Sequence, residues 1–421
     1  MSAGGGRAAL VVGAGPVGLS CALALRALGV QATVLESEPE DRLRPGSRAI
    51  YVHRASLELL ERIRSGLGRE IGAEGVVWPV KRTFWRGREV FARTYPPRPP
   101  DLLPPFTSLP QTEIERQLAR ACRAAGVEVV RGAQVEALAV GAEGVEVRTS
   151  DGASRSAAYV VGADGARSAT RGAIGVPMRG SRSENTFIVV DVVEDPDDPT
   201  PPARVFHYQH PEVGRRNVLL VPFAGGWRAD LQCHHGEDPG RLAGDEGVRS
   251  WIAMVLGPRY AERIAWVSTY RFLQVVARAF ADERRRVVLI GDAAHLFAPF
   301  GARGMNSGIA DAFTAAAAIG AALTAADRET AIAAIEGFAA KRRDAALRNL
   351  DAAGRALAVM QPRSPRMWAK RRAAAVLAPR SQRAGAWLDS APYGPRLGDA
   401  RLGGGRRRVL GDARGAKPAG Y

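Results

Sequence analysis

Residues 8–36 read AALVVGAGPVGLSCALALRALGVQATVLE, and this stretch decides the fold. An apolar run leads into a glycine-rich turn, an amphipathic helix follows, and a second apolar run ends the stretch. The four parts lie at 8–12, 13–18, 17–28 and 31–35. A change from strand to helix to strand over about 30 residues is typical of a βαβ unit with parallel strands.

The three glycines of that turn have separate mechanical roles. Gly13 permits the tight turn, Gly15 lets the backbone approach a pyrophosphate, and Gly18 lets the helix pack closely on the strand. Glu36 stands at the end of the second strand, where a carboxylate accepts hydrogen bonds from ribose hydroxyls. Because this carboxylate also repels a 2′-phosphate, the unit suits FAD or NAD better than NADP.

A second stretch later in the chain, 286–312, reads RVVLIGDAAHLFAPFGARGMNSGIADA. An apolar strand ends at Gly291-Asp292, a loop with Pro and Gly covers 298–304, and a helix is expected from Met305 onward. Backbone amides at a helix start carry partial positive charge, which favours an anionic or electron-rich ligand. The alternative is an ordinary strand-to-helix connection that Asp292 caps.

Residues 182–280 have a different pattern, because helical periodicity fades and short alternating runs replace it. The pattern predicts an antiparallel sheet with one face packed and the other free to roof a pocket. His207 and Tyr208 are neighbours on one strand, so at most one of them faces that pocket. Segment 78–106 contains a Pro-rich tract and predicts one strand followed by an irregular excursion over a cavity.

The composition is that of a globular protein, with 46% hydrophobic and 24% charged residues. The net charge of +16 comes almost wholly from Arg, which is scattered with short clusters at 284–286, 341–343 and 406–408. None of these clusters is interleaved with aromatic residues, as nucleic-acid-binding surfaces often are. We therefore expect no nucleic-acid partner, and we expect most of this charge to lie on a solvated face.

Targeting and redox signals point to the cell interior. No window is long and apolar enough to span a bilayer, and the N-terminus lacks the charged and apolar regions of a signal peptide. Cys21, Cys122 and Cys233 have no metal-ligand spacing, and the first two fall on apolar helix positions. The sequence therefore predicts no membrane span, no metal site and a reducing, cytoplasmic setting.

The chain resembles the single-component flavoprotein aromatic hydroxylases, the para-hydroxybenzoate hydroxylase-like family. Three signals stand in the family's order: the glycine turn with Glu36, VGADGARS at 161–168 with Arg171, and 291–306 with its Gly291-Asp292 and Gly304-Met305-Asn306. Further agreement occurs at 46–50, 110–111 and 222–228, so the similarity spans roughly 8–350.

The resemblance implies a set of FAD contacts. The glycine turn and Glu36 hold the adenosine and pyrophosphate, Arg48 and Gln111 face the flavin and its ribityl chain, and Asp164 touches both FAD and the visiting NAD(P)H. The full implied set is Gly13, Gly15, Pro16, Gly18, Glu36, Arg48, Gln111, Asp164, Gly165, Gly291, Asp292, Pro299, Gly304, Met305 and Asn306.

The fold implied is α/β: a Rossmann-like FAD-binding domain with an inserted antiparallel β-sheet substrate domain and C-terminal helices. The expected division is FAD-binding parts at 7–77, 107–181 and 281–352, an excursion near the substrate at 78–106, a substrate sheet at 182–280, C-terminal helices at 353–401 and a weakly ordered basic tail at 402–421.

The activity implied is monooxygenation. In the family, NAD(P)H reduces FAD, O₂ adds to give a flavin C4a-hydroperoxide, and an OH group passes to a phenolic or polycyclic aromatic compound. The catalytic residues stay unassigned; the candidates are Arg48, His207, Tyr208 and Pro299, with His295 as a further possible base. The expected partners are the small aromatic substrate and O₂, for a monomer or a homodimer.

Three alternatives stay open. The first is another flavin oxidoreductase on the same fold, such as an epoxidase, an N-oxygenase or an alkene reductase. The second is an NAD-dependent dehydrogenase that uses the first unit alone, and the third is a basic nucleic-acid-binding protein. The chain also departs from the family's pattern, since Phe338 and Lys341-Arg342 stand where a Tyr and a Glu-Arg pair are usual.

Overall fold

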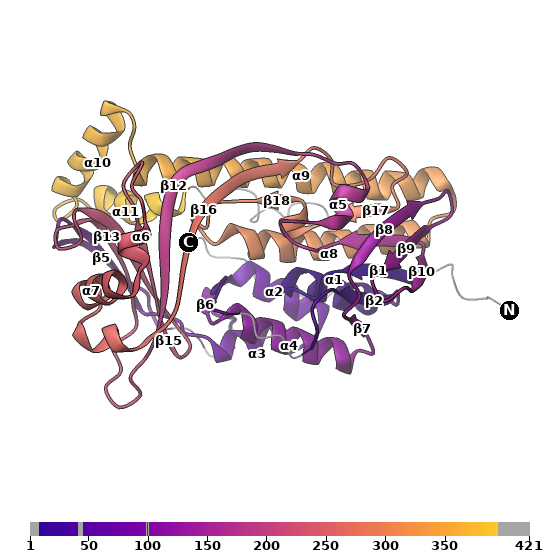
Figure 1. Ribbon diagram of the computed structural model, residues 1–421, viewed down its shortest axis with the longest axis horizontal. Coiled ribbons are helices and arrows are strands. Elements are labelled where there is room, and N and C mark those ends of the chain that lie inside the picture. The colour runs from indigo at the N-terminus through magenta and orange to yellow at the C-terminus, as the bar shows by residue number, and fades with distance from the viewer. Residues whose placement is uncertain (1–7, 41–44, 98, 100, 395–421) are drawn as a thin grey trace.

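The structure is a computed structural model, which describes residues 8–40, 45–97, 99 and 101–394. The expected basic tail at 402–421 lies outside the described residues. A parallel sheet with its helices forms one half of the molecule and a larger sheet forms the other, as Figure 1 shows. The predicted α/β architecture is confirmed.

A five-stranded parallel sheet lies at the centre of the first half. Its order is β17 (Val287–Leu289), β11 (Tyr159–Gly162), β1 (Ala8–Val12), β2 (Gln31–Glu36) and β7 (Glu128–Arg131). The chain starts at the middle strand and builds outward on both sides. The loops that follow β1 and β11 therefore diverge and open a crevice at the carboxyl ends of the strands.

The predicted first helix is confirmed as α1 (Pro16–Ala27). Pro16 stands at its first turn, where a fixed φ suits a helix, and Gly29 ends it with a φ of +77°. Its Leu, Ala and Cys side chains are buried against the sheet and against α4 (Gln111–Ala124) and α8 (Arg303–Leu323). This packing holds the glycine turn at the edge of the crevice.

The second half is an eight-stranded sheet. Its order is β18 (His295–Leu296), β16 (Ile264–Ala277), β12 (Met178–Val193), β15 (Gly226–Gln232), β14 (Arg216–Phe223), β13 (Ala203–His210), β4 (Val80–Trp85) and β5 (Arg88–Thr94). All neighbours are antiparallel except β13 and β4, which are parallel. The sheet predicted at 182–280 is present, with β4 and β5 added from earlier in the chain and β18 from later.

The segment 78–106 is more regular than its sequence indicates. Residues 80–94 form the β4–β5 hairpin, whose turn residues Arg86 and Gly87 both have positive φ, of +51° and +83°, while the described residues between 95 and 105 form no helix or strand, as expected. Two positive φ values are typical of the tight turn that matches the twist of a hairpin. The sequence reading missed it because Arg-Gly is not among the usual turn pairs.

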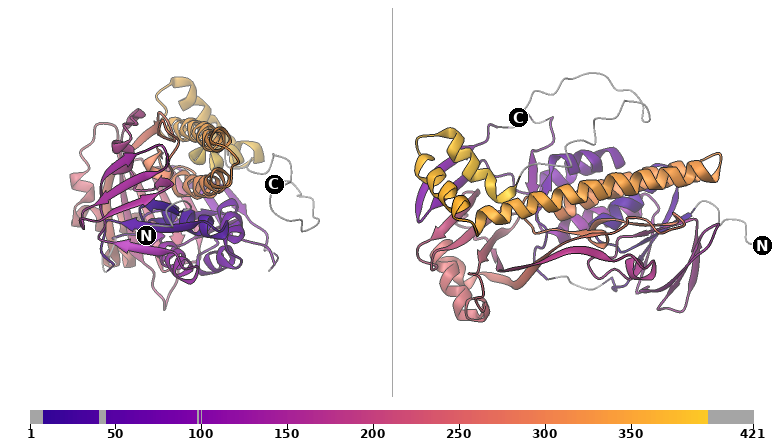
Figure 2. Two further views of the ribbon diagram at one scale, coloured as in Figure 1. Left: turned by 90° about the vertical axis from the view of Figure 1, so that its right-hand side faces the viewer. Right: turned by 90° about the horizontal axis from the view of Figure 1, so that it is seen from above.

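Two kinds of long element join the halves. β12 and β16 arch from the nucleotide half to the sheet (Figure 1), and the helix α9 (Arg328–Met360) runs along the molecule (Figure 2). β12 crosses the boundary expected at 181/182, and α9 crosses the one expected at 352/353. The amino-acid composition changes at both expected boundaries, but the backbone hydrogen bonds of β12 and α9 continue across them.

The remaining elements cover the core. A three-stranded sheet and a two-stranded sheet flank the nucleotide half: β8 (Val135–Val140), β9 (Val145–Thr149), β10 (Ser154–Ala157), β3 (Tyr51–His53) and β6 (Phe106–Ser108). The other helices are α2 (Arg54–Ile63), α3 (Leu67–Glu74), α5 (Ala169–Ala173), α6 (Gly240–Ala243), α7 (Asp245–Val255), α10 (Pro365–Leu377) and α11 (Gln382–Ser390). Among the described helices, none has the length and apolar character that crossing a bilayer requires.

Candidate functional site

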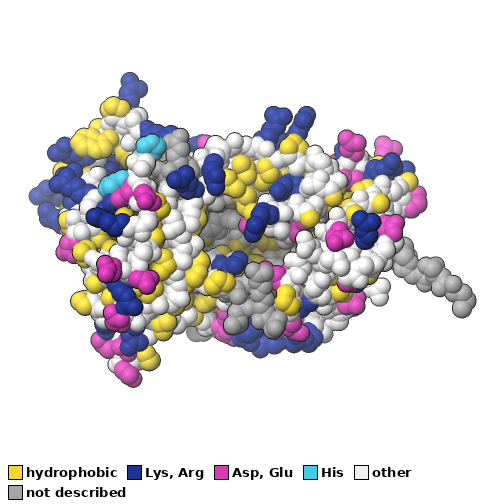
Figure 3. All heavy atoms as spheres, in the orientation of Figure 1, with side chains coloured by type: hydrophobic (Ala, Val, Ile, Leu, Met, Phe, Trp, Pro, Cys, Tyr) yellow, Lys and Arg dark blue, Asp and Glu magenta, His cyan; other side chains and the backbone are white. Residues whose placement is uncertain are grey.

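A cavity of about 1600 Å³ lies where the carboxyl ends of the parallel strands face the eight-stranded sheet. Figure 3 shows the surface hollowed between the two halves. Most residues that the sequence assigned to a cofactor line it: Gly13, Gly15, Pro16, Glu36, Arg48, Gln111, Asp164, Gly165, Asp292, Pro299, Gly304, Met305 and Asn306. Gly18 and Gly291 do not line it, because Gly18 packs on Gly13 and Gly291 packs beside Val17.

The glycine turn leaves room for a ligand at one position. Gly13 has a φ of +104°, and a Cβ on Gly18 would lie 1.9 Å from the Gly13 carbonyl oxygen, so both glycines serve the turn and its packing. A Cβ on Gly15 would meet nothing within 4 Å, and its φ of −72° and ψ of 176° suit any residue. The absence of a side chain at Gly15 is therefore required neither by the backbone nor by packing, and its effect is to leave space in the cavity for a ligand.

Glu36 fixes this turn from the next strand. Its Oε2 accepts a 2.6 Å hydrogen bond from the Ala14 amide, and its Oε1 accepts from the Glu38 amide at 3.0 Å. The side chain is buried yet reaches the cavity wall. The Ser37 hydroxyl also donates to Oε1, at 3.2 Å, so Glu36 is held firmly at the end of β2, where a carboxylate suits ribose hydroxyls.

Asp164 is held by the helix that follows it. Its Oδ1 accepts from the Ser168 hydroxyl at 2.5 Å and its Oδ2 accepts from the Thr170 amide at 2.9 Å. Asp164 thus fixes the start of α5 while it lines the cavity. This local role could not be predicted from the residues alone, because an acid-Gly turn has many uses.

Arg48 has a strained backbone at the cavity wall, with a φ of +53°. The sheet holds it there: Asp191 accepts from the Ser47 amide at 2.6 Å and from the Ser47 hydroxyl at 2.8 Å, and Arg228 donates to the Arg48 carbonyl. A non-glycine residue in the left-handed region costs about 1–2 kcal/mol. Such strain persists where surrounding contacts impose it, and it clusters at functional sites.

The start of α8 presents its first amides to the cavity. Ala302 precedes the helix with a φ of +51°, and Gly304, Met305 and Asn306 line the wall. The Asn306 side chain is fully occupied, since its Oδ1 accepts from the His53 amide and the Ser56 hydroxyl and its Nδ2 donates to two carbonyls. Its backbone amide, rather than its side chain, is therefore the group that can meet a ligand.

Asp292 differs from the other acids of this half. Its carboxylate faces the cavity, and among the described residues it has no hydrogen-bond partner. The residue is exposed to the cavity, but the protein atoms packed around its carboxyl desolvate it and raise its pKa, and the nearby His295 lowers that pKa. A carboxylate in this state accepts a ligand hydroxyl without first losing a protein partner.

A buried network lies behind the loop. Asp311 accepts from the Gly291 amide at 3.0 Å, bonds the His295 Nε2 at 2.6 Å and accepts from the Arg342 Nε at 2.5 Å. Burial would raise the pKa of Asp311, but Arg342 and His295 outweigh it and lower the pKa to about 2. His295 braces the loop and does not line the cavity. Arg342 of the 341–343 cluster is an exception to the charge expected on a solvated face, because its side chain is 2% exposed.

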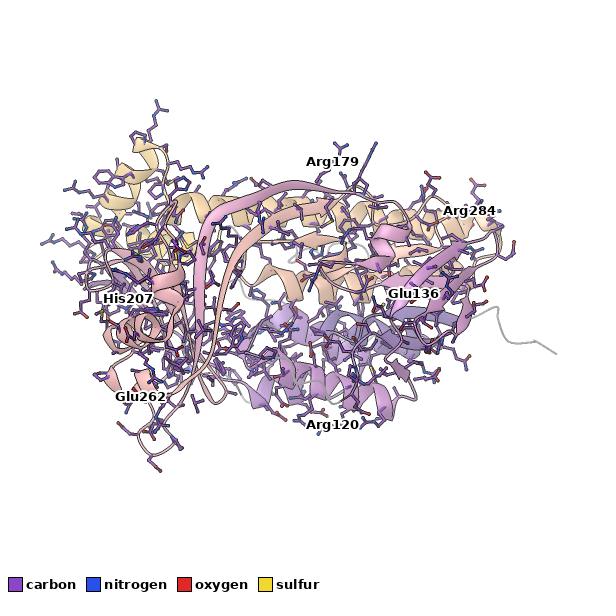
Figure 4. The ribbon with its side chains drawn as sticks, viewed as in Figure 1. Arg120, Glu136, Arg179, His207, Glu262 and Arg284 are labelled. Carbon is purple, nitrogen blue, oxygen red and sulfur yellow. The ribbon has the colours of Figure 1, made fainter. Side chains whose placement is uncertain are left out.

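His207 and Tyr208 do not line the cavity. His207 stacks on Phe84, with ring centroids 4.6 Å apart, and burial with the neighbouring His210 lowers its pKa to about 3. The Tyr208 hydroxyl donates to the Leu388 carbonyl at 2.8 Å, and burial raises its pKa. Figure 4 shows His207 in the sheet half. β13 lines the cavity at Arg204 and Phe206 and has passed beneath α11 by Tyr208.

A carboxylate that sequence reasoning missed lies on β15. Asp230 lines the cavity, its Oδ1 is buried without a hydrogen-bond partner, and Tyr270 of β16 lines the same wall. Burial raises the pKa of Asp230 to about 6, with Arg228 lowering it and Asp191 raising it. Strand alternation places Asp230 on the same face as Arg228, but only the register of the sheet shows which face meets the cavity.

The polar groups at the crevice fit a flavin dinucleotide. The open space at Gly15 suits a pyrophosphate, Glu36 suits a ribose, and the free Asp292 carboxylate suits the hydroxyls of a ribityl chain. The first amides of α8 suit the electron-rich end of the ring system. Fold and site together define a dinucleotide-binding protein of the doubly wound α/β class, with a second sheet over its cavity.

Comparison with known proteins makes this class specific. The family model for the FAD binding domain matches residues 7–353, and the chain therefore belongs to the FAD binding domain family. The resemblance predicted from the sequence motifs is confirmed.

Two curated proteins are similar to this chain over part of their length. The 3-(3-hydroxy-phenyl)propionate/3-hydroxycinnamic acid hydroxylase of Mycolicibacterium smegmatis is 31% identical over 313 residues, which cover 72% of this chain and 53% of that protein. The 6-methylpretetramide 4-monooxygenase of Streptomyces rimosus is 32% identical over 319 residues, which cover 73% and 54%. The chain spans about half the length of these curated relatives.

A solved structure shares the whole fold. The crystal structure of p-nitrophenol 4-monooxygenase PnpA from Pseudomonas putida DLL-E4 has a TM-score of 0.75 and 24% sequence identity. The match covers 92% of this chain and 98% of that one. The likeness extends through both sheets and so supports the fold of the sheet half as well as the nucleotide half.

Proposed function

We propose that the protein is an NAD(P)H-dependent FAD monooxygenase that hydroxylates a phenolic or polycyclic aromatic compound. The cavity carries the proposal, because one space joins the glycine turn to the aromatic wall of the eight-stranded sheet. Its volume of about 1600 Å³ exceeds the roughly 300–1,000 Å³ of an ordinary small-ligand pocket, so it has room for a dinucleotide and a second molecule. FAD, when bound, supplies the redox chemistry that couples NAD(P)H to O₂.

The nucleotide side of the cavity binds and orients the cofactor in this proposal. The backbone at Gly15 meets the pyrophosphate, Glu36 accepts from the ribose and Asp292 accepts from the ribityl hydroxyls. The positive end of α8 and the Arg48 guanidinium favour negative charge on the ring system. These groups are fixed before any ligand arrives, which lowers the cost of stabilising charge during reaction.

The sheet side encloses the substrate. Phe187 lies 4.7 Å from Phe272 and 5.7 Å from Phe300 between ring centroids, and all three line the cavity next to Pro299. Aromatic rings pack well against a flat aromatic substrate. They also exclude water from the region where oxygen transfer takes place.

Asp230 holds the phenol proton in this proposal. Its pKa of about 6 lies near neutral pH, where a general base works best, and its unpartnered oxygen gives it free acceptor capacity. Removing the phenol proton makes the ring more electron-rich and so more reactive toward an electrophilic oxygen. His207, with its pKa near 3 and its position outside the cavity wall, lacks access to that proton.

The remaining parts of the proposal concern partners and setting. NAD(P)H visits the groove beside Asp164 and Arg167, where the arginine suits its phosphates. All three cysteines are free and buried, which fits a reducing, cytoplasmic compartment. We propose a monomer or a homodimer, which sedimentation of the purified chain distinguishes.

The test is oxygen insertion by the full chain loaded with FAD. We expect a phenol to accelerate NADH or NADPH oxidation under ¹⁸O₂, and the product to carry one ¹⁸O on a ring carbon. A product without ¹⁸O would contradict monooxygenation, and ¹⁸O found in an epoxide or an N-oxide would move the chain to another class of flavin oxygenase. Asp230→Asn is expected to lower the rate most between about pH 6, above which Asp230 is ionised, and the phenol pKa of about 10. Below about pH 6 the Asp230 carboxyl is itself protonated, so the variant should have little effect there.

A further inference from the structure

Three cations stand in a row at one end of the cavity. Arg204 of β13 is the register partner of Lys81 of β4, and Lys81 is the register partner of Arg93 of β5. Paired residues on neighbouring strands place their side chains on the same face, and all three line the cavity. Like charges in adjacent pairs destabilise a sheet unless an anion offsets them.

Among the described residues, the carboxylate nearest Arg93 and Arg204 is that of Asp389, and its geometry is poor for a hydrogen bond. Asp389 of α11 lies 3.6 Å from Arg204, measured Oδ1 to Nη1, and 3.9 Å from Arg93, measured Oδ2 to Nε. Both distances exceed a hydrogen bond, and the two atoms Arg204 Nη1 and Asp389 Oδ1 have no hydrogen-bond partner. The side chains of Arg204 and Asp389 are each 2% exposed, so water does not screen this shortfall.

An aromatic ring joins the cluster to the loop before α8. The Tyr393 centroid lies 4.5 Å from the Lys81 Nζ and 4.3 Å from the Arg204 Cζ. The Tyr393 carbonyl accepts from the Arg303 Nη2 at 2.9 Å, and Arg303 is the first residue of α8. The cationic end therefore adjoins the loop that contains Pro299 and Gly301, where the proposed cofactor ring lies.

We propose that Lys81, Arg93 and Arg204 form a subsite for a carboxylate of the substrate, so that the substrate is an aromatic acid. This inference rests on the proposed function and narrows its substrate class. A buried arginine without a hydrogen bond is costly, and a ligand carboxylate restores the charge-assisted bonds that Asp389 does not make. The subsite would hold the acid end while the aromatic wall holds the ring.

The probes for the test are two pairs of compounds that differ only in charge: 3-hydroxybenzoate with 3-hydroxybenzamide, and 1-hydroxy-2-naphthoate with 1-hydroxy-2-naphthamide. Binding is measured on the FAD-loaded full chain by the change in flavin absorbance. We expect the acid of at least one pair to bind roughly ten- to a hundredfold more tightly than its amide, as charge-assisted bonds imply. Equal affinities in both pairs, or no measurable binding of either acid, would overturn the subsite.

Single-residue variants test whether the preference for the acid over the amide depends on the proposed cations. Lys81→Met and Arg204→Gln are each expected to weaken acid binding about tenfold and to leave amide binding within twofold. Asp389→Asn removes the competing carboxylate and is expected to tighten acid binding severalfold. An acid preference that survives in both cation variants would overturn the proposal; Lys81→Met keeps the test valid if Arg204→Gln does not fold.

Arg82 provides the matched control. It neighbours Lys81 on β4 but its side chain is 50% exposed and pairs with Glu89 on the outer face. Arg82→Gln therefore removes the same charge from the same strand without entering the cavity, and we expect acid binding within twofold of the unchanged chain. A loss equal to that of Lys81→Met would show a general charge effect and overturn the subsite.

The two proposals fail in different ways. If amides stimulate NAD(P)H oxidation and ¹⁸O incorporation as well as acids do, the monooxygenase stands and the acid subsite falls. If acids bind with the stated preference but neither acid gains ¹⁸O, the subsite stands and the proposed function falls.

Discussion

The two sides of the cavity treat their polar groups differently. On the nucleotide side, Asp311, Asn306 and Asp164 have their hydrogen bonds made within the protein. On the sheet side, Arg204 Nη1 and Asp230 Oδ1 are buried without a hydrogen-bond partner. These three nucleotide-side groups are thus fixed before a ligand binds, whereas these two sheet-side atoms remain available to a ligand.

The difference indicates what each side selects. A satisfied network holds backbone amides and turns in one position, which suits a cofactor that the whole family shares. Unsatisfied buried groups cost stability until a ligand pairs with them, and such groups reject ligands that lack the matching partner. We propose that substrate choice belongs to the sheet side. Among the described acids that line the nucleotide side of the cavity, Asp292 alone has no hydrogen-bond partner.

The largest effect on folding is expected from Asp311→Asn. The change leaves Arg342 buried without its charge partner, and breaking a buried pair costs about 3–5 kcal/mol of unfolding free energy. Because the pKa of Asp311 is lowered to about 2, the stabilisation is full above the unfolded pKa near 3.8 and is lost as pH falls between the two. Urea unfolding of the apoprotein from pH 7 down to pH 2 measures both.

The control for that change is Asp344→Asn. Asp344 pairs with Arg348 one helical turn away, and both side chains are well exposed. Surface pairs of this kind contribute about 0.3–0.5 kcal/mol. Equal losses in the two variants would contradict the buried network.

A smaller effect, on cofactor binding rather than folding, is expected from Asp292→Ala. The carboxylate has no hydrogen-bond partner among the described residues, so the unfolding free energy of the apoprotein should stay nearly unchanged. A lost hydrogen bond to a charged group costs about 1.5–3 kcal/mol, which weakens FAD binding roughly ten- to a hundredfold. Titration of the apoprotein by flavin fluorescence measures this, and unchanged FAD affinity would contradict the assigned role.

Asp230→Asn is expected to raise stability by about 1–2 kcal/mol at neutral pH. The folded pKa near 6 exceeds the unfolded value near 3.8, so the folded carboxyl holds its proton longer and stability falls as pH rises through that interval. The gain from the variant should be absent at pH 4 and complete above about pH 7. Urea titrations of both chains at both pH values measure the sign of this change in unfolding free energy. A loss of stability at pH 7 would contradict the interpretation that the Asp230 carboxyl is buried without a hydrogen-bond partner on Oδ1.

Sequence motifs captured the nucleotide side well. Gly13 has a backbone requirement, while Gly15, Glu36 and Asp292 face the ligand space, and the spacing of these four residues predicted both the fold and the residues that meet at the crevice. The buried position of Arg342 escaped prediction, because a Lys-Arg-Arg run resembles a solvated helix face until its packing is known.

The sheet side was predicted only as a sheet. The alternation of side chains along a strand predicted that His207 and Tyr208 point to opposite faces of the sheet. It did not predict that the part of β13 that lines the cavity ends at Phe206, before both residues. Asp230 and Arg204 became candidates only through register and burial, which join strands far apart in the chain. Cross-strand neighbours leave no signal in the spacing of a single sequence.

The smallest effect on folding, and the most direct test, comes from Gly15→Ala. Its backbone angles suit alanine and its Cβ meets nothing within 4 Å, so the unfolding free energy should stay within about 0.5 kcal/mol or rise slightly. The added methyl group nevertheless enters the space assigned to the pyrophosphate. Equilibrium titration with FAD should give one equivalent bound to the unchanged chain and at least tenfold weaker binding to the variant. No FAD uptake by the unchanged chain, or equal affinity in the two, would contradict the account.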